Sequence, residues 1–404
     1  MKEAYIVDAV RSAFGKYVGS LASIRTDDLA ALTIKALIDR NPAVPVEKID
    51  DVILGCHNQA GEDNRNVARM AALLAGLPFT VPGETINRLC SSGMSAVVHA
   101  KRAIQSGDGE LFIAGGVEHM TRGPWVISKS AQPFGKDVEM FDSSFGWRFV
   151  NPKMKQLYGT DPMGNTAENL AELYKISRED QDLFAYQSQQ KAAKAKASGR
   201  LAEEIFPIEI VQRKKPSIWF REDEFIREDT TLEKLAALKT YFKKEENGGT
   251  VTAGNASGIN DGAAAMLLAS EAALNQYNLT PKARIVASQV VGVEPKYMGI
   301  GPVEASKKAL EKAGLTLDDM DVLEFNEAFS AQVLACSRLL GLEDNDPRIN
   351  PNGGAIAIGH PLGASGTRIL QTAAIELHQK QKKYALVAMC VGVGQGYATI
   401  IEKV

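Results

Sequence analysis

Cys90 occupies a position at which a thiol can act as a nucleophile. In the segment 86–108, apolar side chains recur after it at helical spacing (Met94, Val97, Val98 and Ile104), and Gly107 fits a C-terminal cap. A helix is therefore expected to begin at or just after Cys90. The unpaired N–H groups and dipole of a helix N-terminus favour a thiolate, so we expect a lowered thiol pKa. The alternative is a small buried core residue, the more common role of a cysteine.

His360 is a candidate acceptor for the thiol proton. It lies in the glycine-rich segment NPNGGAIAIGHPLGASGTR (350–368), and the following Pro361 suits the first turn of a helix. Glycines around a histidine let backbone and substrate approach its ring closely. A lone histidine is more often structural or solvated, and a glycine-rich loop sometimes cradles phosphate. No GKS or GKT sequence follows, which weakens the nucleotide interpretation.

A second cysteine, Cys390, lies in MCVGVGQG (389–396), where an apolar strand ends in alternating glycines. A thiol at a strand end, among backbone N–H groups, is expected to serve as an acid or base beside an oxyanion hole. A structural cysteine is the alternative here too. Cys56 and Cys336 have no such setting, so we assign both to packing.

A weak internal repeat, at a separation of about 270 residues, relates these segments. Asp51 aligns with Asp321, and the same offset places Cys90 on His360. Short Val/Ile-rich runs alternate with helical patterns in both halves, which predicts an α/β fold built from two similar halves. The predicted parts are an N-terminal half (1–121 plus 261–281), an inserted loop domain (122–260) and a C-terminal half (282–404).

Two further segments have polar or small side chains where a ligand could bind. LEFNEAFSAQ (323–332) places Asn326 and Glu327 at a strand end, where an amide can hold a water or a carbonyl; the alternative is a capping pair. The run TVTAGNASGINDGAAAMLLAS (250–270) is rich in small residues, through which backbone could approach an extended ligand. A tightly packed loop is the alternative.

Composition excludes several classes of protein. The 404 residues are 45% hydrophobic and carry a net charge of -3, so no general attraction to nucleic acid or to an anionic membrane is expected. Four cysteines without a CxxC pair indicate neither a disulfide scaffold nor a metal site. The N-terminal residues are typical of a strand rather than a signal peptide, and no apolar run approaches the roughly 20 residues that span a bilayer. We expect a cytoplasmic protein.

Taken together, NRLCSSGMSAV, NEAF, NGGAIAIGHPLGASGTR and MCVGVGQG resemble the four signature blocks of the thiolase family, in order and spacing. The resemblance covers essentially the whole chain. It implies the thiolase fold, with two βαβαβαββ halves related by pseudo-twofold symmetry, and acetyl-CoA C-acyltransferase activity. It also implies that Cys90 is acylated, that His360 activates it and that Cys390 moves a proton at the alpha carbon. Asn326 would hold a water in one oxyanion hole, and the N–H groups of Cys90 and Gly392 would form the other.

The same resemblance implies how substrate is bound. Ala253 and Ser257 match the loop that contacts pantetheine, Arg227 matches a basic residue near the adenine of CoA, and Met163 and Met298 match residues lining the acyl pocket. Coenzyme A and acyl-CoA would be substrates, without a permanently bound cofactor. A homodimer or homotetramer is implied.

Departures from the common pattern of the family narrow the choice of acyl chain in the substrate. Pro162 stands where acetoacetyl-specific members often have histidine, and His119 in GGVEHM resembles degradative members. The segments 58–78 and 145–159 resemble thiolases that cleave 3-oxoadipyl-CoA. The distal carboxylate of 3-oxoadipyl-CoA needs a cation to bind it. The sequence offers Arg148, Lys153 and Lys155 for this role; the alternative is that all three are solvated charges.

Three other functions stay open on the residues alone. An acetoacetyl-CoA thiolase is the nearest alternative. A decarboxylating ketoacyl synthase would be expected to use two histidines, where this chain offers His360 and Cys390. An inactive thiolase-fold lipid carrier would not need all four candidate catalytic side chains.

Overall fold

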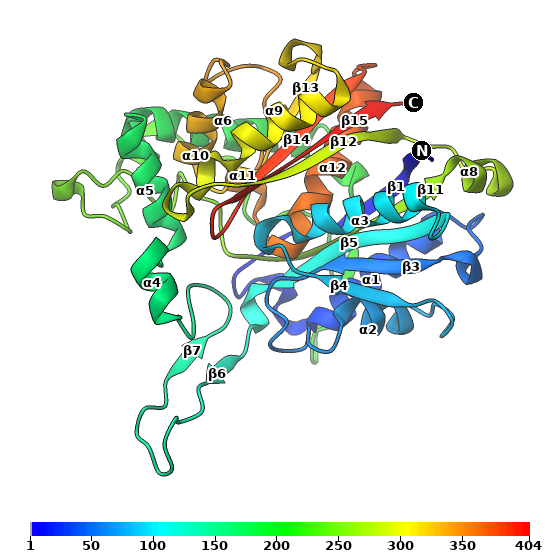
Figure 1. Ribbon diagram of the computed structural model, residues 1–404, viewed down its shortest axis with the longest axis horizontal. Coiled ribbons are helices and arrows are strands. Elements are labelled where there is room, and N and C mark those ends of the chain that lie inside the picture. Colours follow the sequence, from blue (N-terminus) through cyan, green and yellow to red (C-terminus); the bar gives the residue numbers. More distant parts are fainter. Residues whose placement is uncertain (1) are drawn as a thin grey trace.

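The computed structural model describes residues 2–404 and has a mixed β-sheet at its centre (Figure 1). The strand order is β13-β14-β15-β12-β1-β11-β5-β3-β4. The N-terminal strands are β1 (Ala4–Ser12), β3 (Asp51–Gly55), β4 (Gly83–Ile86), β5 (Leu111–His119) and β11 (Asn260–Ser270). The C-terminal strands are β12 (Ala283–Gly292), β13 (Val322–Phe325), β14 (Tyr384–Val391) and β15 (Gln395–Lys403). Only Tyr5 and Ile6 of β1 pair with β12, so the two groups of strands are joined at one narrow point.

Helices form three layers around these two groups of strands (Figure 1). Helices α3 (Ser92–Ser106) and α12 (Leu362–Gln379) pack against each other between them and share one apolar core with both. Helices α1 (Thr26–Arg40) and α2 (Val67–Leu74) cover the outer face of the N-terminal strands. Helices α9 (Gly301–Ala313) and α10 (Ser330–Leu339) cover that of the C-terminal strands. The central pair is largely buried, with exposed residues in α3 only near its C-terminal end. The outer helix α10 is also buried from Ser330 to Ser337, because α5 (Met163–Leu173) and α6 (Arg178–Ala197) pack against it.

The predicted helix after Cys90 is confirmed, and so is its end. Helix α3 stops at Gly107, whose φ of 87° is a left-handed conformation that glycine adopts without steric cost. Helix α12 begins directly after Pro361, whose fixed φ and missing N–H suit the start of a helix. Both reactive segments therefore lie at the N-terminus of a central helix.

Corresponding elements follow one another in the two halves. The order β1-α1-β3-α2-β4-α3-β5-β11 is matched by β12-α9-β13-α10, a single parallel bridge at Ile349, then α12-β14-β15. The repeat alignment is wrong by one residue at the second strand. Asp50, not Asp51, is the counterpart of Asp321, because each accepts two backbone N–H groups at the start of the neighbouring strand.

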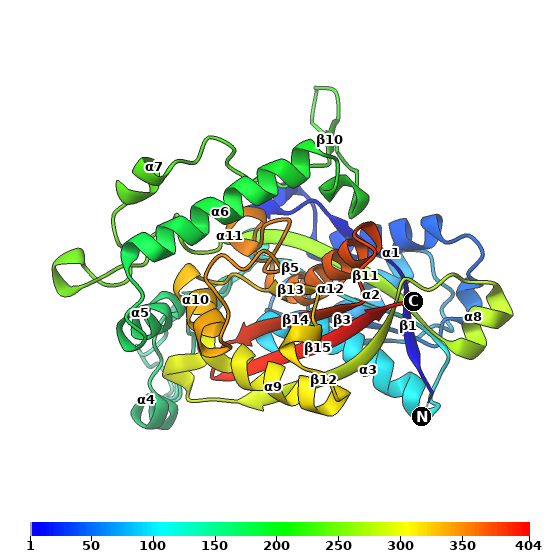
Figure 2. The same ribbon diagram turned by 90° about the horizontal axis from the view of Figure 1, so that it is seen from above.

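The segment between β5 and β11 forms small elements that pack on both halves. It contains β6 (Trp125–Ile127) and β7 (Met140–Asp142), which form a projecting hairpin in Figure 1. Its helices are α4 (Pro152–Tyr158), α5 (Met163–Leu173), α6 (Arg178–Ala197) and α7 (Leu232–Ala236). Short strands β9 (Ile208–Ile210) and β10 (Ile218–Phe220) pair together. Helix α6 runs along one side of the molecule in Figure 2 and contacts α10 and α11 (Ala355–Ile358).

Two marginal strands complete the central sheet: β2 (Gly15–Lys16) pairs with β11, and β8 (Ile205–Phe206) pairs with β1. Since β8 comes from the inserted segment, that segment contributes to the sheet as well as lying over it. The three-part division, 1–121 plus 261–281, 122–260 and 282–404, remains our proposal; Met1 lies outside the described residues. Among residues 2–404, no helix is long and apolar enough to cross a membrane.

Gly116 in β5 tests how closely this central layer is packed. A Cβ added there would lie 2.0 Å from the carbonyl oxygen of Gly363 in α12. We expect Gly116→Ala to lower the thermal midpoint by about 5 °C or more, because the obstacle is backbone that cannot move aside. Differential scanning calorimetry measures this. The matched control is Gly292→Ala in β12, where the nearest atom would be 4.0 Å away; equal losses in the two variants would contradict the packing argument.

Candidate active site

The N-terminal turns of α3 and α12 cross in direct backbone contact. A Cβ at Gly93 would meet the Gly363 carbonyl oxygen at 2.5 Å, and one at Gly366 would meet the Met94 nitrogen at 2.4 Å. The glycines of both signature segments are therefore needed first for this crossing. Cys90, just before α3, and His360, just before α12, are consequently held at the same place, as the repeat predicts.

Cys90 lies in a 3₁₀ turn, Leu89–Ser91, which leads directly into α3. The backbone N–H groups of Gly392 and of Cys90 itself point at its sulfur and favour the thiolate. Burial nevertheless dominates and raises the pKa of the thiol to about 11. The expectation of a lowered thiol pKa is therefore wrong for this structure, because desolvation outweighs the amide dipoles. The resting residue is a thiol and needs a base.

The hydrogen bonds of His360 are compatible with that role. Its side chain is buried, and Nδ1 lies 2.6 Å from Ser365 Oγ. Ser365 Oγ also lies 2.9 Å from the carbonyl oxygen of Pro361, to which its single proton is donated. The Nδ1–H of His360 then donates to Ser365, which leaves an unprotonated Nε2 as proton acceptor. Burial and the positive charge of Arg368 lower the imidazole pKa to about 3, so the ring is neutral.

The strands of the C-terminal half supply the rest of the site. Asn326 follows β13, and its Nδ2 lies 3.4 Å from His360 Nε2. Among residues 2–404, no group donates a hydrogen bond to its buried Oδ1, which can therefore accept one from a water or a substrate group. Cys390, near the end of β14, is buried beside Met298 and Ala328. Burial, followed by the nearby Cys90, raises the pKa of the Cys390 thiol well above its ordinary value, so it carries a proton to donate.

Glu118, at the end of β5, joins the two halves behind these residues. Its carboxylate accepts backbone N–H groups from His57 and Asn58, and from Gly363 in the first turn of α12. The last contact satisfies an N–H that a helix leaves free at its start. Burial, opposed by the His57 amide, raises the pKa of Glu118 to about 7. Sequence inspection missed this role because the contacts join segments far apart in the chain.

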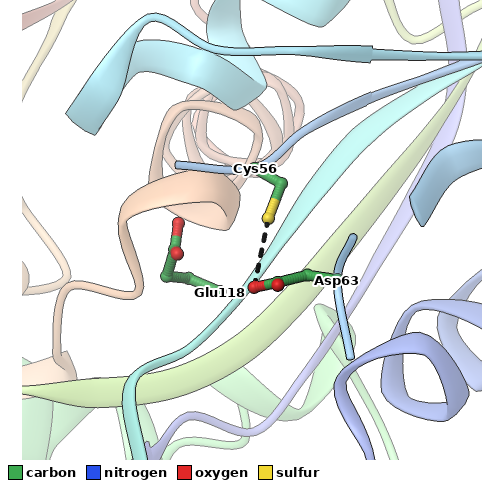
Figure 3. Close-up of side chains that lie close together, drawn as sticks. All are labelled: Cys56, Asp63 and Glu118. Carbon is green, nitrogen blue, oxygen red and sulfur yellow. Dashed lines mark hydrogen bonds between the residues drawn. The ribbon is translucent and has the colours of Figure 1, made fainter. Parts of the chain in front are cut away.

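Cys56 and Asp63 lie next to Glu118, as Figure 3 shows. The Cys56 sulfur lies 3.8 Å from Asp63 Oδ2, and potential ligand atoms of all three side chains lie within 4.8 Å of one another. The oxygens of Glu118 already accept three N–H groups, and Asp63 Oδ1 accepts that of Gly61. Because these potential ligand atoms already accept backbone N–H groups, the three residues fit a role in packing better than a metal site.

The residues predicted to contact the acyl chain lie close to this centre. A Cβ built at Gly392 would be 3.8 Å from the sulfur of Met163, which starts α5. Met298 packs against Cys390. Glu327, beside Asn326, points elsewhere: it is buried and accepts hydrogen bonds from Ser188, Asn350 and Ile356. Its role is structural.

The residues predicted to contact coenzyme A are more exposed. Ala253 is exposed and Ser257 half-buried, on a loop tied by the Ser257 N–H to the carbonyl oxygen of Ala328, two residues after Asn326. Arg227 is exposed, and its guanidinium carbon lies 5.8 Å from the centre of the Phe225 ring. All three side chains remain available to a ligand.

The three candidate cations for an acyl carboxylate differ in their surroundings. Lys153 and Lys155, on α4, are exposed. Arg148 is half-buried and donates to the carbonyl oxygen of Ser143 at 3.0 Å and to Asn58 Oδ1 at 3.3 Å. The structure therefore favours Arg148 over the two lysines.

Comparison with known proteins agrees with this geometry. Residues 4–272 match the model of the thiolase N-terminal domain and residues 279–403 that of the thiolase C-terminal domain. This chain belongs to the thiolase family. The thiolase is 59% identical to a beta-ketoadipyl-CoA thiolase of Acinetobacter baylyi, over 100% of both chains. It is 58% identical to a 3-oxoadipyl-CoA/3-oxo-5,6-dehydrosuberyl-CoA thiolase of Escherichia coli, again over 100% of both.

A solved structure confirms the thiolase fold. The acetyl-CoA acetyltransferase of Bacillus anthracis superposes with a TM-score of 0.92 at 41% identity, covering 100% of this chain and 99% of the other. The enzyme is thus an acyltransferase that cleaves a 3-ketoacyl-CoA with coenzyme A. These similarities argue against the two other functions considered from the sequence, a decarboxylating ketoacyl synthase and an inactive lipid carrier.

The raised thiol pKa and lowered imidazole pKa predict how Cys90 of the free thiolase reacts. Because its pKa is near 11, the thiolate fraction grows as pH rises, so the rate of alkylation by iodoacetamide is expected to climb throughout pH 7 to 9.5. Stopped-flow alkylation with mass-spectrometric assignment to Cys90 measures this. A rate independent of pH over that range would indicate a preformed thiolate–imidazolium pair and contradict the neutral resting state.

Ser365 is expected to control that reactivity through His360. In Ser365→Ala the imidazole loses the partner that keeps its proton on Nδ1, and we expect kcat for thiolysis to fall about 10-fold or more with little change in KM. A ¹⁵N spectrum of the imidazole reports the tautomer directly. Ser365→Thr, which keeps the hydroxyl, is the matched control. An unchanged tautomer in the alanine variant would argue against the assignment.

Proposed function

We propose that this thiolase cleaves 3-oxoadipyl-CoA with coenzyme A to give acetyl-CoA and succinyl-CoA. The single observation that carries the proposal is the full-length identity of 59% and 58% to two enzymes whose names specify this substrate. Arg148 is half-buried, and within residues 2–404 its hydrogen bonds go to Ser143 and Asn58 rather than to a carboxylate, which is consistent with an acidic acyl chain. Acetoacetyl-CoA is the second candidate, because the similar Bacillus anthracis structure is an acetyl-CoA acetyltransferase.

In the proposed first half-reaction, Cys90 attacks the 3-keto carbon as its thiol proton passes to His360 Nε2. The resulting alkoxide collapses, the bond between the alpha and beta carbons breaks, and the acyl group stays on Cys90. The other product is the enolate of acetyl-CoA, which Cys390 protonates at carbon. The N–H groups of Cys90 and Gly392 stabilise one developing oxyanion, and Asn326 with His360 the other, an effect typically of about 3–4 kcal/mol per donor.

In the second half-reaction, the thiol of a second coenzyme A attacks the acyl group on Cys90. Its proton returns to the Cys390 thiolate, and His360 gives its proton back to the Cys90 thiolate that leaves. Both catalytic groups are then in their starting forms. Because one product leaves before coenzyme A reacts, the kinetics are ping-pong.

We further propose that Arg227, Ala253 and Ser257 contact coenzyme A, and that Met163 and Met298 line the acyl pocket. Support comes from their match to the family's pattern and from the exposure or position of each side chain described above. The enzyme is proposed to need no permanent cofactor, to act in the cytoplasm and to assemble as a homodimer or homotetramer. All four cysteines are free thiols, a form that a reducing compartment preserves.

The substrate assignment predicts a ranking of acyl-CoA thioesters. We expect kcat/KM for coenzyme A-dependent thiolysis to be highest for 3-oxoadipyl-CoA, when acetoacetyl-CoA and a 3-ketoacyl-CoA of medium chain length are measured beside it. Loss of thioester absorbance follows the reaction. Preference for acetoacetyl-CoA or for the apolar chain would make the enzyme a general thiolase, and no turnover of any would contradict the proposed activity.

The roles of the two active-site cysteines can be separated. Cys390→Ala is expected to abolish carbon–carbon bond cleavage but to retain exchange of an acyl group between acyl-CoA and labelled coenzyme A, because that exchange forms no carbanion. Cys90→Ala is expected to lose both reactions. Retention of cleavage by Cys390→Ala would remove Cys390 from the mechanism.

A further inference from the structure

Arg148 is a partly buried cation without a counter-ion. Among residues 2–404, no carboxylate lies within 4.0 Å of its guanidinium, and its hydrogen bonds go to two neutral acceptors, the Ser143 carbonyl and Asn58 Oδ1. A charge withdrawn from water without a partner is costly. An arginine has five N–H donors, so several remain for a ligand. An anion bound at these remaining donors would therefore compensate the charge of Arg148.

Two chains of contacts connect Arg148 to the segments around the reactive thiol. On one side, Arg148 binds Asn58, and the neighbouring His57 carbonyl accepts a hydrogen bond from Asn87 Nδ2 at 3.0 Å. Asn87 Oδ1 in turn accepts the N–H of Leu89, the residue before Cys90. Arg148 thus contacts the loop that shapes the turn carrying the nucleophile.

On the other side, Trp147 Nε1 donates to the carbonyl oxygen of Asp161 at 3.2 Å. Asp161 lies two residues before Met163, whose sulfur approaches Gly392. The segment with Arg148 is therefore connected to Leu89 and to Met163, the two residues whose side chains approach Gly392.

His57 and Asn58 are held rigidly beside this guanidinium. Their N–H groups donate to Glu118 at 3.0 and 3.1 Å, and Asn58 Nδ2 donates to Ser143 Oγ at 3.2 Å. The His57 ring is neutral, because burial and then Arg148 lower its pKa to about 4. A neutral imidazole can donate one N–H to an anion while Arg148 supplies the charge.

We propose that Arg148 and His57 bind the distal carboxylate of the acyl chain, and that Asn58 aims the guanidinium at it. The inference rests on the proposed function, since it requires a dicarboxylic acyl group. In 3-oxoadipyl-CoA, three carbon–carbon bonds of about 1.5 Å separate the attacked carbon from the carboxylate, so the carboxylate lies about 4 Å away. A planar guanidinium binds a carboxylate through two parallel hydrogen bonds, which makes it selective against a methyl group at the same position.

The test compares 3-oxoadipyl-CoA with 3-oxohexanoyl-CoA, which has the same chain length but ends in a methyl group. For Arg148→Met, kcat/KM with 3-oxoadipyl-CoA is expected to fall about 30-fold, the usual effect of losing hydrogen bonds to a charged group. With 3-oxohexanoyl-CoA it should stay within about twofold of the wild-type value. Arg148→Lys keeps the charge without the paired donors and should give an intermediate loss.

Asn58→Asp tests the role of the Arg148 charge while leaving the arginine in place. It adds an almost isosteric carboxylate at the atom 3.3 Å from Arg148 Nη2 and so gives the guanidinium an internal counter-ion. It should lower kcat/KM with 3-oxoadipyl-CoA alone. The exposed Lys153→Met is the matched control and should leave the ratio of the two substrates unchanged. Cys90 alkylation at the wild-type rate shows that each variant is folded.

The outcomes separate this inference from the proposed function. If the wild-type enzyme does not prefer 3-oxoadipyl-CoA to 3-oxohexanoyl-CoA, both are wrong. If it does, but Arg148→Met lowers both substrates equally or neither, the substrate assignment stands and the carboxylate subsite is overturned. A selective loss in Lys153→Met instead would move the subsite to α4.

Discussion

The backbone contact between the N-terminal turns of α3 and α12 is the constraint on which the rest of the structure depends. Gly93 and Gly363 meet at a distance that no side chain would allow, and the two helices are buried between both groups of strands. This crossing brings Cys90 and His360 to one point, although 270 positions of sequence separate them. The strand ends of the C-terminal half then deliver Asn326, Cys390 and Gly392 to the same point.

Burial at that crossing determines the chemistry of the resting site. It raises the thiol pKa of Cys90 and lowers the imidazole pKa of His360, so both groups are neutral until substrate arrives. The buried amide oxygen of Asn326 and the N–H groups directed at the Cys90 sulfur are fixed dipoles in a site of low polarity. Such dipoles stabilise developing charge without reorganising, which is the largest contribution to catalysis in many enzymes.

Much of the fold and the central site could be predicted from sequence, since they depend on local patterns. The spacing of Met94, Val97 and Val98 predicts α3, and the repeat pairs Cys90 with His360. The Cys90 pKa could not be predicted in this way, because its direction depends on tertiary burial rather than on the helix terminus.

Contacts between segments far apart in the chain could not be predicted from the sequence either. Glu118 binds Gly363 across the two halves, and nothing local to GGVEHM indicates that partner. The preference for Arg148 over Lys153 and Lys155 also needed the structure, because only exposure and the contact with Asn58 distinguish them. The alignment of Asp51 with Asp321 failed by one residue, since two adjacent aspartates give the same pattern and only hydrogen bonding tells them apart.

Trapping the intermediate shows whether the half-buried Cys90 carries the acyl group of a dicarboxylic 3-ketoacyl-CoA. The enzyme is mixed with 3-oxoadipyl-CoA in the absence of free coenzyme A, quenched in acid and digested for mass spectrometry. We expect a succinyl group on the peptide containing Cys90, released when coenzyme A is added before the quench. A succinyl group on another residue, or acetyl-CoA formed with no acylated peptide, would contradict it.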